Sequence, residues 1–175
     1  MTIADAAKAA AYLFVVVIVQ IAILSDVTIV HGRVQLLLVS VVAIALLRGA
    51  VFGAIAGFCA GLIADTGIFG MLGFTSLLLT LAGYWIGRYG ETTGRDRAHA
   101  PLLSVGVITV LYQFGALILH FVLGEPAPGR EVLLVSLVPT MILNLLLTVP
   151  VYALVRRILR QPEWSGTARE VRLLG

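Results

Sequence analysis

The chain has 175 residues, of which 60% are apolar and 12% are charged, and its formal net charge is +3. A soluble globular domain carries roughly 45–50% apolar and about 25% charged residues, and a small domain has too much surface to bury this excess. The composition therefore excludes an ordinary soluble domain. It predicts one integral membrane domain whose basic residues lie at the membrane boundaries rather than on a nucleic-acid-binding face.

Six apolar runs predict an all-α membrane protein, a compact bundle of six short transmembrane helices. The runs are residues 9–24, 34–47, 50–64, 71–86, 101–123 and 132–155. The connections between them are residues 25–33, 48–49, 65–70, 87–100 and 124–131. The first run lacks a small-residue cleavage site, so we interpret it as a span and not as a signal peptide. The predicted organisation is a transmembrane domain over residues 1–158 and a cytoplasmic tail over residues 159–175. The last stretch of the tail, residues 168–174, could form a short amphipathic helix or be disordered, and we favour disorder.

The boundary between the second and third helices depends on length and on one charge. As a single helix, residues 34–64 would be roughly 46 Å long, whereas the hydrocarbon core is about 30 Å thick. Such a helix would also hold Arg48 near the bilayer centre, at a cost of about 2.5–3.5 kcal/mol. We therefore predict a break at Arg48-Gly49, giving two helices of roughly 21–23 Å that thin the bilayer locally.

The distribution of basic residues is consistent with this arrangement. With six spans and a cytoplasmic N-terminus, only Arg33 and Arg130 of the 12 Lys and Arg residues face outward, as the positive-inside rule expects. Five spans with an external N-terminus separate the charges nearly as well but leave Arg48 in lipid. Charge alone does not decide between them; length and Arg48 favour six spans, with both termini in the cytoplasm.

Small residues recur every four positions on the third predicted helix. This ridge comprises Gly49, Gly53, Gly57 and Gly61. Small side chains at that spacing let another helix approach closely, and such packing holds helices together in lipid. Gly83 and Gly87 repeat the spacing on the fourth helix. Two interpretations are open: a contact inside this bundle, or a docking site for the transmembrane helix of a partner.

Asp65 ends the third predicted helix, where a negative charge opposes the helix macrodipole. In one interpretation its side-chain oxygens cap the turn over residues 66–69, within a tight re-entrant turn indicated by Gly67, Gly70 and Gly73. In the other, Asp65 is a functional polar residue, because carboxylates at membrane depth are functional candidates by default.

The remaining polar and reactive residues predict no catalytic centre, metal site or cofactor. No zinc-protease motif, nucleophile elbow or phosphate-binding loop is present, and His31, His99 and His120 are scattered along the chain. Cys59 is expected to be a small packed apolar residue. Six polar residues within the spans are expected to form interhelical hydrogen bonds. They are Gln20, Gln35, Thr80, Gln113, Asn144 and Thr148. In addition, Thr140 and Asn144 could form a small polar spot.

Residues 49–65, followed by residues 71–77 and 83–87, resemble the rod shape-determining protein MreD family. The shared features are a glycine-rich helix that ends in Gly-Leu-x-x-Asp and a Leu-Gly pair that opens the next span. The matching positions are Gly57, Gly61, Asp65, Leu72 and Gly73. The length of the chain, the number of spans and the short connections agree with the same family.

The resemblance implies a non-enzymatic scaffold of the bacterial cell-elongation machinery, which synthesises peptidoglycan at the cytoplasmic (inner) membrane. The implied partners are a single-span protein of the MreC type and, through it, MreB, a RodA-type polymerase and a penicillin-binding transpeptidase. The implied fold is that of the S components of energy-coupling-factor transporters. No motif position is catalytic in the family.

A second interpretation is that the chain is itself an S component that binds a small-molecule substrate. Its outward-facing groups would then line a pocket, and small residues of the first helix, Ala6 with Ala10 and Ala7 with Ala11, would contact a transducing subunit. The pocket would comprise Asp26, His31, Arg33, Asp65 and Arg130. Aromatic residues make up only 8% of the chain, which favours the scaffold.

Overall fold

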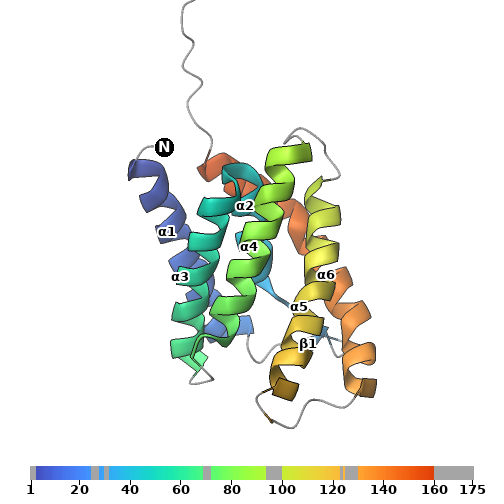
Figure 1. Ribbon diagram of the computed structural model, residues 1–175. Helices are drawn as coiled ribbons and strands as arrows, with labels where there is room; N and C mark the ends of the chain where they lie inside the picture. The colour runs from blue at the N-terminus through green and yellow to red at the C-terminus, as the bar shows by residue number, and fades with distance from the viewer. Residues whose placement is uncertain are drawn as a thin grey trace, which may run out of the picture.

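The computed structural model describes residues 3–24, 28–29, 32–68, 72–93, 100–122, 124 and 130–159. Within these residues the chain forms six α-helices: α1 (Ile3–Val19), α2 (Leu36–Arg48), α3 (Ala50–Ile68), α4 (Phe74–Thr93), α5 (Ala100–Val122) and α6 (Arg130–Ile158). A π-helical turn, η1 (Gln20–Leu24), extends α1. Two short antiparallel strands, β1 (Thr28–Ile29) and β2 (Gly32–Arg33), precede α2. The helices run alternately up and down the bundle (Figure 1), which confirms the predicted helical bundle.

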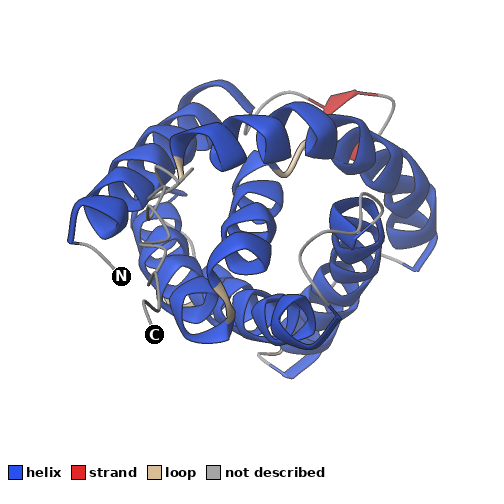
Figure 2. Ribbon diagram, turned by 90° about the horizontal axis from the view of Figure 1, so that it is seen from above, coloured by secondary structure: helices blue, strands red, loops and turns tan. Residues whose placement is uncertain are grey.

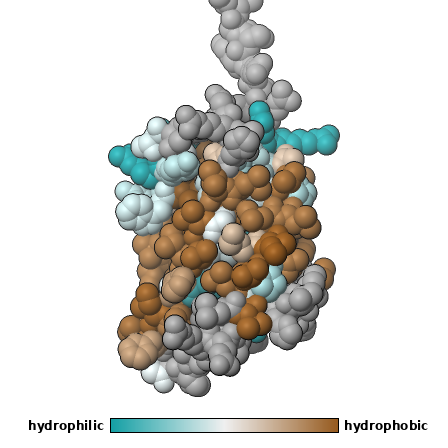
Figure 3. Space-filling view, turned by 90° about the vertical axis from the view of Figure 1, so that its right-hand side faces the viewer, coloured by the Kyte–Doolittle hydropathy of each residue, from teal (hydrophilic) through white to brown (hydrophobic). Residues whose placement is uncertain are grey.

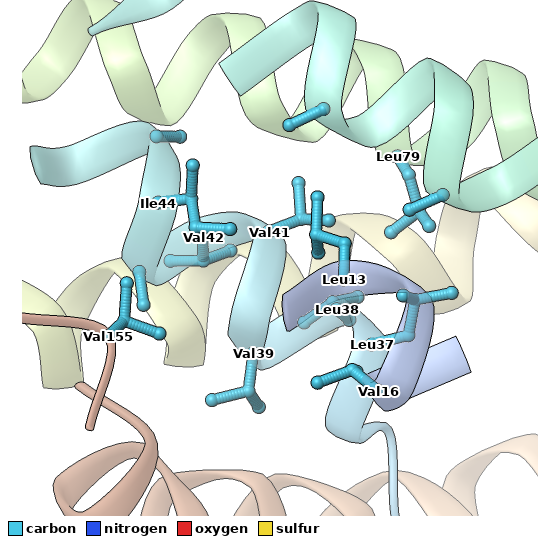
Figure 4. Packing of buried hydrophobic residues seen from close by; sticks show 14 of the residues in the cluster. Leu13, Val16, Leu37, Leu38, Val39, Val41, Val42, Ile44, Leu79 and Val155 are labelled. Atoms are coloured by element: carbon cyan, nitrogen blue, oxygen red, sulfur yellow. The ribbon is translucent and has the colours of Figure 1, made fainter. Parts of the chain in front are cut away.

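The short helix α2 lies at the centre of this bundle. Its sequence is apolar on every face, which is typical of a helix with no exposed side. Every residue from Leu37 to Leu46 is buried, and α2 contacts each of the other five helices. Seen from above, a ring of helices encloses one central helix (Figure 2), and Val39 and Val41 of α2 point to opposite sides of it (Figure 4). Packing around α2 therefore forms the core.

Among the described residues, four helices are long and apolar enough to cross a membrane. Their candidate spans are Ala6–Ile23, Ala50–Gly67, Ala100–Ile118 and Val135–Ile158. Large apolar side chains such as Phe14, Val51 and Ile118 are exposed on the outside, and an apolar belt covers the face drawn in Figure 3. The chain is therefore a membrane protein. Two of the six predicted spans are not among these candidates. α2 has only 13 residues, and α4 carries Arg88 and Glu91 near its end.

The predicted break between the second and third helices is confirmed. α2 ends at Arg48 and α3 begins at Ala50. Gly49 between them has a φ of 94°, a left-handed conformation that glycine adopts without the steric penalty of a side chain. Its amide donates a hydrogen bond of 2.8 Å to the carbonyl of Ala45, so the turn also closes the end of α2.

Other predicted boundaries differ from the structure. The connection over residues 87–100 was placed too early, because α4 continues through polar residues to Thr93; these residues extend the helix beyond its apolar segment. Similarly, α3 continues past Asp65 and Gly67 to Ile68. The packed bundle reaches Leu159, which is buried, and the predicted tail from residue 160 onward lies outside the described residues. α6 includes both Pro139 and Pro150.

Candidate functional site

The glycine ridge of α3 lies directly against α4. A Cβ atom built on Gly53 would lie 2.6 Å from the carbonyl oxygen of Gly83, and one built on Gly57 would overlap the backbone of Leu79. One built on Gly61 would overlap the backbone of Ser76. The space beside these glycines is thus filled mainly by the backbone of α4, with Ala45 of α2 also beside Gly53. Backbone cannot move aside as a flexible side chain could.

The glycines of α4 complete the same contact from the other side. A Cβ atom on Gly83 would overlap the carbonyl of Gly53, and one on Gly87 would overlap the backbone of Ala50. Gly49 packs against the carboxylate of Glu91. All six glycines singled out from the sequence therefore lie at contacts within this chain. The glycine face of α3, which the sequence alone could also assign to a partner helix, is therefore occupied by α4.

Asp65 connects the last turn of α3 to the first turn of α4. Its side chain is buried, with 4% exposed. The carboxylate accepts hydrogen bonds from the amides of Gly73 at 2.9 Å, Thr75 at 3.1 Å and Ser76 at 3.2 Å. The first amides of a helix have no partner within the helix and form its positive end. Asp65 supplies hydrogen-bond acceptors for the first amides of α4. Its negative charge lies at the positive end of the macrodipole of α4, where it is stabilised.

The predicted role of Asp65 as a cap of its own turn, residues 66–69, is therefore wrong. Because α3 continues to Ile68, Asp65 lies inside the helix and its side chain points across to the neighbouring helix. The charge that would oppose the macrodipole of α3 is compensated by the N-terminus of α4. Gly73, with a φ of 93°, forms the turn that brings those amides to the carboxylate.

Glu91, which the sequence analysis did not single out, makes the reciprocal contact at the opposite end. It lies in the last turn of α4, and its Oε1 atom accepts a hydrogen bond of 2.9 Å from the amide of Ala50, the first residue of α3. The spacing of the residues could have revealed this pair. Gly57, Gly61 and Asp65 follow one another at intervals of four, as do Gly83, Gly87 and Glu91.

A second polar site, buried between α2, α5 and α6, is centred on Asn144. Its Oδ1 atom accepts from the amide of Gln35 at 3.1 Å, and its Nδ2 atom donates to Gln35 Oε1 and Thr109 Oγ1, both at 3.2 Å. Nearby, Thr140 Oγ1 accepts from the amide of Arg33 at 3.1 Å. The polar spot expected around Thr140 and Asn144 is present and includes two further residues.

The side chains of this cluster form hydrogen bonds with the irregular backbone that leads into α2. Gln20 adds two more hydrogen bonds there, donating to the carbonyl of Val34 at 3.0 Å and accepting from the amide of Leu37 at 3.3 Å. Non-helical backbone at membrane depth is tolerated only where protein groups replace water as partners. The polar side chains thus allow the chain to enter the core before α2 begins.

Arg48 lies at the end of the bundle rather than at its middle. Its Nη2 atom donates a hydrogen bond of 3.1 Å to the carbonyl of Leu159, just after α6. A cation near the C-terminus of a helix is favourable for the macrodipole and satisfies one of its last carbonyls. Arg48 therefore fastens the end of α6 to the end of α2.

The predicted substrate pocket is only partly described. Asp26 and His31 lie outside the described residues, as does His99, and the side chains of His120 and Arg130 are likewise not described. Asp65 faces the start of α4 instead of an outward pocket. No group of three or more His, Cys, Asp and Glu residues that could hold a metal occurs among the described residues.

Cys59 is exposed, so its expected packing in the core is wrong. Successive residues of an α-helix are about 100° apart, so residues two positions apart point to opposite sides. Cys59 lies two residues from both Gly57 and Gly61. It therefore points away from the side of α3 that contacts α4. The thiol therefore lies on the outer face of α3, among apolar side chains such as Ile55 and Phe58 that are also exposed.

Comparison with known proteins matches this chain to one family. The model of the family described as rod shape-determining protein MreD matches residues 8–161. The chain is also similar to the cell shape-determining protein MreD of Streptococcus pneumoniae (strain ATCC BAA-255 / R6), with 34% identity over 90 residues, which are 51% of this chain and 54% of that protein. The match thus spans about half the length of this curated relative. No solved structure matches the chain.

Proposed function

Because the chain belongs to the rod shape-determining protein MreD family, we propose that its role in cell-shape determination is that of a non-enzymatic membrane scaffold. The observation that carries the proposal is the family match, which extends over residues 8–161 and so covers most of α1 and all of α2 to α6. The scaffold would assemble the complex that elongates the cell wall by peptidoglycan synthesis.

The uses of the polar groups support a scaffold rather than an enzyme. Asp65 and Glu91 cap helices, Asn144 and Gln35 hold the entry to α2, and Arg48 binds the end of α6. These groups are thus engaged in holding the bundle together. A bundle fixed in this way suits a protein whose function is to present a constant surface to its partners.

The outer faces of the helices are the surfaces available for contact with partners. The glycine ridge is occupied within the chain, whereas residues such as Ile55, Leu81 and Trp85 are exposed. In lipid these faces could pack against a transmembrane helix by shape and van der Waals contact. We propose an MreC-type single-span protein as the direct partner, with a RodA-type polymerase, a penicillin-binding transpeptidase and MreB in the same complex.

The same proposal places the protein in the bacterial cytoplasmic (inner) membrane with both termini in the cytoplasm. The ends of α2, α4 and α6 lie at the end of the bundle where α1 begins (Figure 1). The described basic residues gathered there are Lys8, Arg48, Arg88, Arg156 and Arg157. An excess of Lys and Arg favours the cytoplasmic side.

The test is affinity purification of the tagged protein from its own host in mild detergent, followed by mass spectrometry. We expect a single-span periplasmic protein of the MreC type together with cell-wall synthases. An unrelated polytopic protein with the same tag, expressed at the same level, serves as the control. If neither partner class is enriched over that control, the scaffold proposal fails.

The alternative function, a substrate-binding S component of a small-molecule transporter, predicts a different result from the same experiment. Paired ATPases and a transmembrane coupling subunit would then be recovered in place of cell-wall synthases. That function also predicts stabilisation by substrate, about 2.7 kcal/mol at a hundredfold excess over the dissociation constant. Screening a vitamin panel by thermal unfolding would reveal it.

A further inference from the structure

A groove with a volume of about 500 Å³ lies between the start of α5 and the end of α6. The start of α5 and the end of α6 lie at the end of the bundle where α1 begins (Figure 1). The residues that line it are Pro101, Leu102, Thr148, Val149, Tyr152, Ala153, Arg156 and Arg157. Among the described residues that line the groove none is acidic, so none of them neutralises the two arginines.

The groove changes in character along its length. Arg156 and Arg157 are exposed in the last turn of α6, where the candidate span Val135–Ile158 ends. Leu102 lies near the start of α5 and Val149 lies deeper in the span of α6, and the exposed side chains of both are apolar. From Thr148 to Arg156 the helix rises by about 12 Å. One end of the groove is therefore cationic at the membrane boundary, and the other is apolar at membrane depth.

This combination matches one class of ligand. Arginine binds phosphate through charge-assisted, often bidentate hydrogen bonds, and basic side chains at the membrane surface attract anionic lipid. A free phosphate would occupy only the cationic end and leave the apolar part empty. We propose that the groove binds one anionic phospholipid, with its phosphate at Arg156 and Arg157 and an acyl chain along Leu102 and Val149.

The arginines also have a structural role that the test must separate from lipid binding. Cations in the last turn of a helix stabilise it through the macrodipole, and this effect does not require an anionic lipid. Bound lipid therefore has to be measured directly, and the stability of each variant has to be compared in a neutral lipid.

The experiment is native mass spectrometry of the full-length protein with phosphatidylglycerol or phosphatidylcholine added. We expect retention of phosphatidylglycerol to fall by roughly 30-fold in the double variant Arg156→Gln, Arg157→Gln, on the basis of about 1 kcal/mol for each charge near the surface. Arg88→Gln is the matched control, because Arg88 is an exposed arginine at the same end but outside the groove. Val149→Trp, which fills the apolar part without changing the charge, should also reduce retention.

Three results would overturn the proposal. The first is equal retention of phosphatidylglycerol by the wild type and by a double variant that keeps the wild-type melting temperature in phosphatidylcholine. The second is an equal loss in Arg88→Gln, which would indicate a diffuse surface charge. The third is complete displacement of the lipid by inorganic phosphate, which would indicate an anion site without a lipid groove.

Discussion

Asp65 and Glu91 occupy equivalent positions at opposite ends of one antiparallel helix pair. Asp65, near the end of α3, accepts hydrogen bonds from the amides that begin α4, and Glu91, near the end of α4, accepts one from the amide of Ala50 that begins α3. Each carboxylate thus lies at the positive end of the other helix. The two helices are fastened at both ends, and glycines bring their backbones together between these points.

The two caps differ in their surroundings, and we expect them to differ in energy. Asp65 is 4% exposed, whereas the side chain of Glu91 is 36% exposed and also contacts Arg88. Asp65→Ala should reduce the free energy of unfolding by about 2 kcal/mol or more, because it leaves buried amides without an acceptor. Asp65→Asn, which keeps one acceptor oxygen, should cost less. Reversible unfolding in bicelles measures both.

The same change at the more exposed cap is the matched control. Glu91→Ala should cost less than Asp65→Ala, because the side chain of Glu91 is partly exposed and caps the amide of Ala50, whereas the buried Asp65 accepts from three amides. An equal or greater loss for Glu91→Ala would contradict the view that burial sets the energy of these caps.

Substitution of Gly57 tests the contact between the two helices. Gly57→Ala should destabilise the protein by about 1–3 kcal/mol, the usual cost of overpacking, because the added methyl group meets the backbone of Leu79. Thermal unfolding of the purified protein measures the loss. Gly106→Ala on α5 is the control: there the nearest atom is Leu145 Cδ2, at 4.0 Å, so this substitution should be neutral or slightly stabilising. Equal losses for the two variants would show that the close α3–α4 contact is not the cause.

The sequence predicted the fold better than it predicted the caps. The apolar runs and the cost of burying Arg48 were sufficient to locate the helices and the break before Gly49, because the lipid environment sets both the length and the composition of a span. The four-residue spacing indicated a helix contact, but it did not identify the partner helix. That depends on tertiary packing, in which α4 occupies the face of Gly57 and Gly61.

Asp65 and the groove show why the remaining features were missed. The role of Asp65 depends on two facts that no local pattern contains: α3 continues one turn further, and the amides of α4 return to the same point. The groove joins Leu102 of α5 to Arg156 of α6, and residues so far apart in the sequence meet only in the folded bundle.

Asn144 should contribute to stability through its three side-chain hydrogen bonds. Interhelical hydrogen bonds in membranes average about 0.6 kcal/mol each. The loss of three such bonds and of the side-chain packing in Asn144→Ala should together reduce the free energy of unfolding by about 2 kcal/mol. Thr148→Val is the control, because the buried hydroxyl of Thr148 donates only to the carbonyl of Asn144 in its own helix. Chemical unfolding in detergent compares the two variants, and a larger loss for Thr148→Val would contradict the importance of the Asn144 cluster.

The orientation in the membrane can be tested with single cysteines. In a Cys59→Ser background, Lys8→Cys and Arg88→Cys should react with a membrane-impermeant maleimide only after the cytoplasmic side is opened, because an excess of basic residues favours that side. Leu72→Cys is the matched position at the opposite end: Leu72 is 71% exposed and lies in the turn before α4, at the far end of the bundle (Figure 1). It should react from outside in spheroplasts. Labelling of Lys8→Cys from outside, with Leu72→Cys protected until the membrane is opened, would reverse the proposed orientation and place Arg156 and Arg157 on the external face.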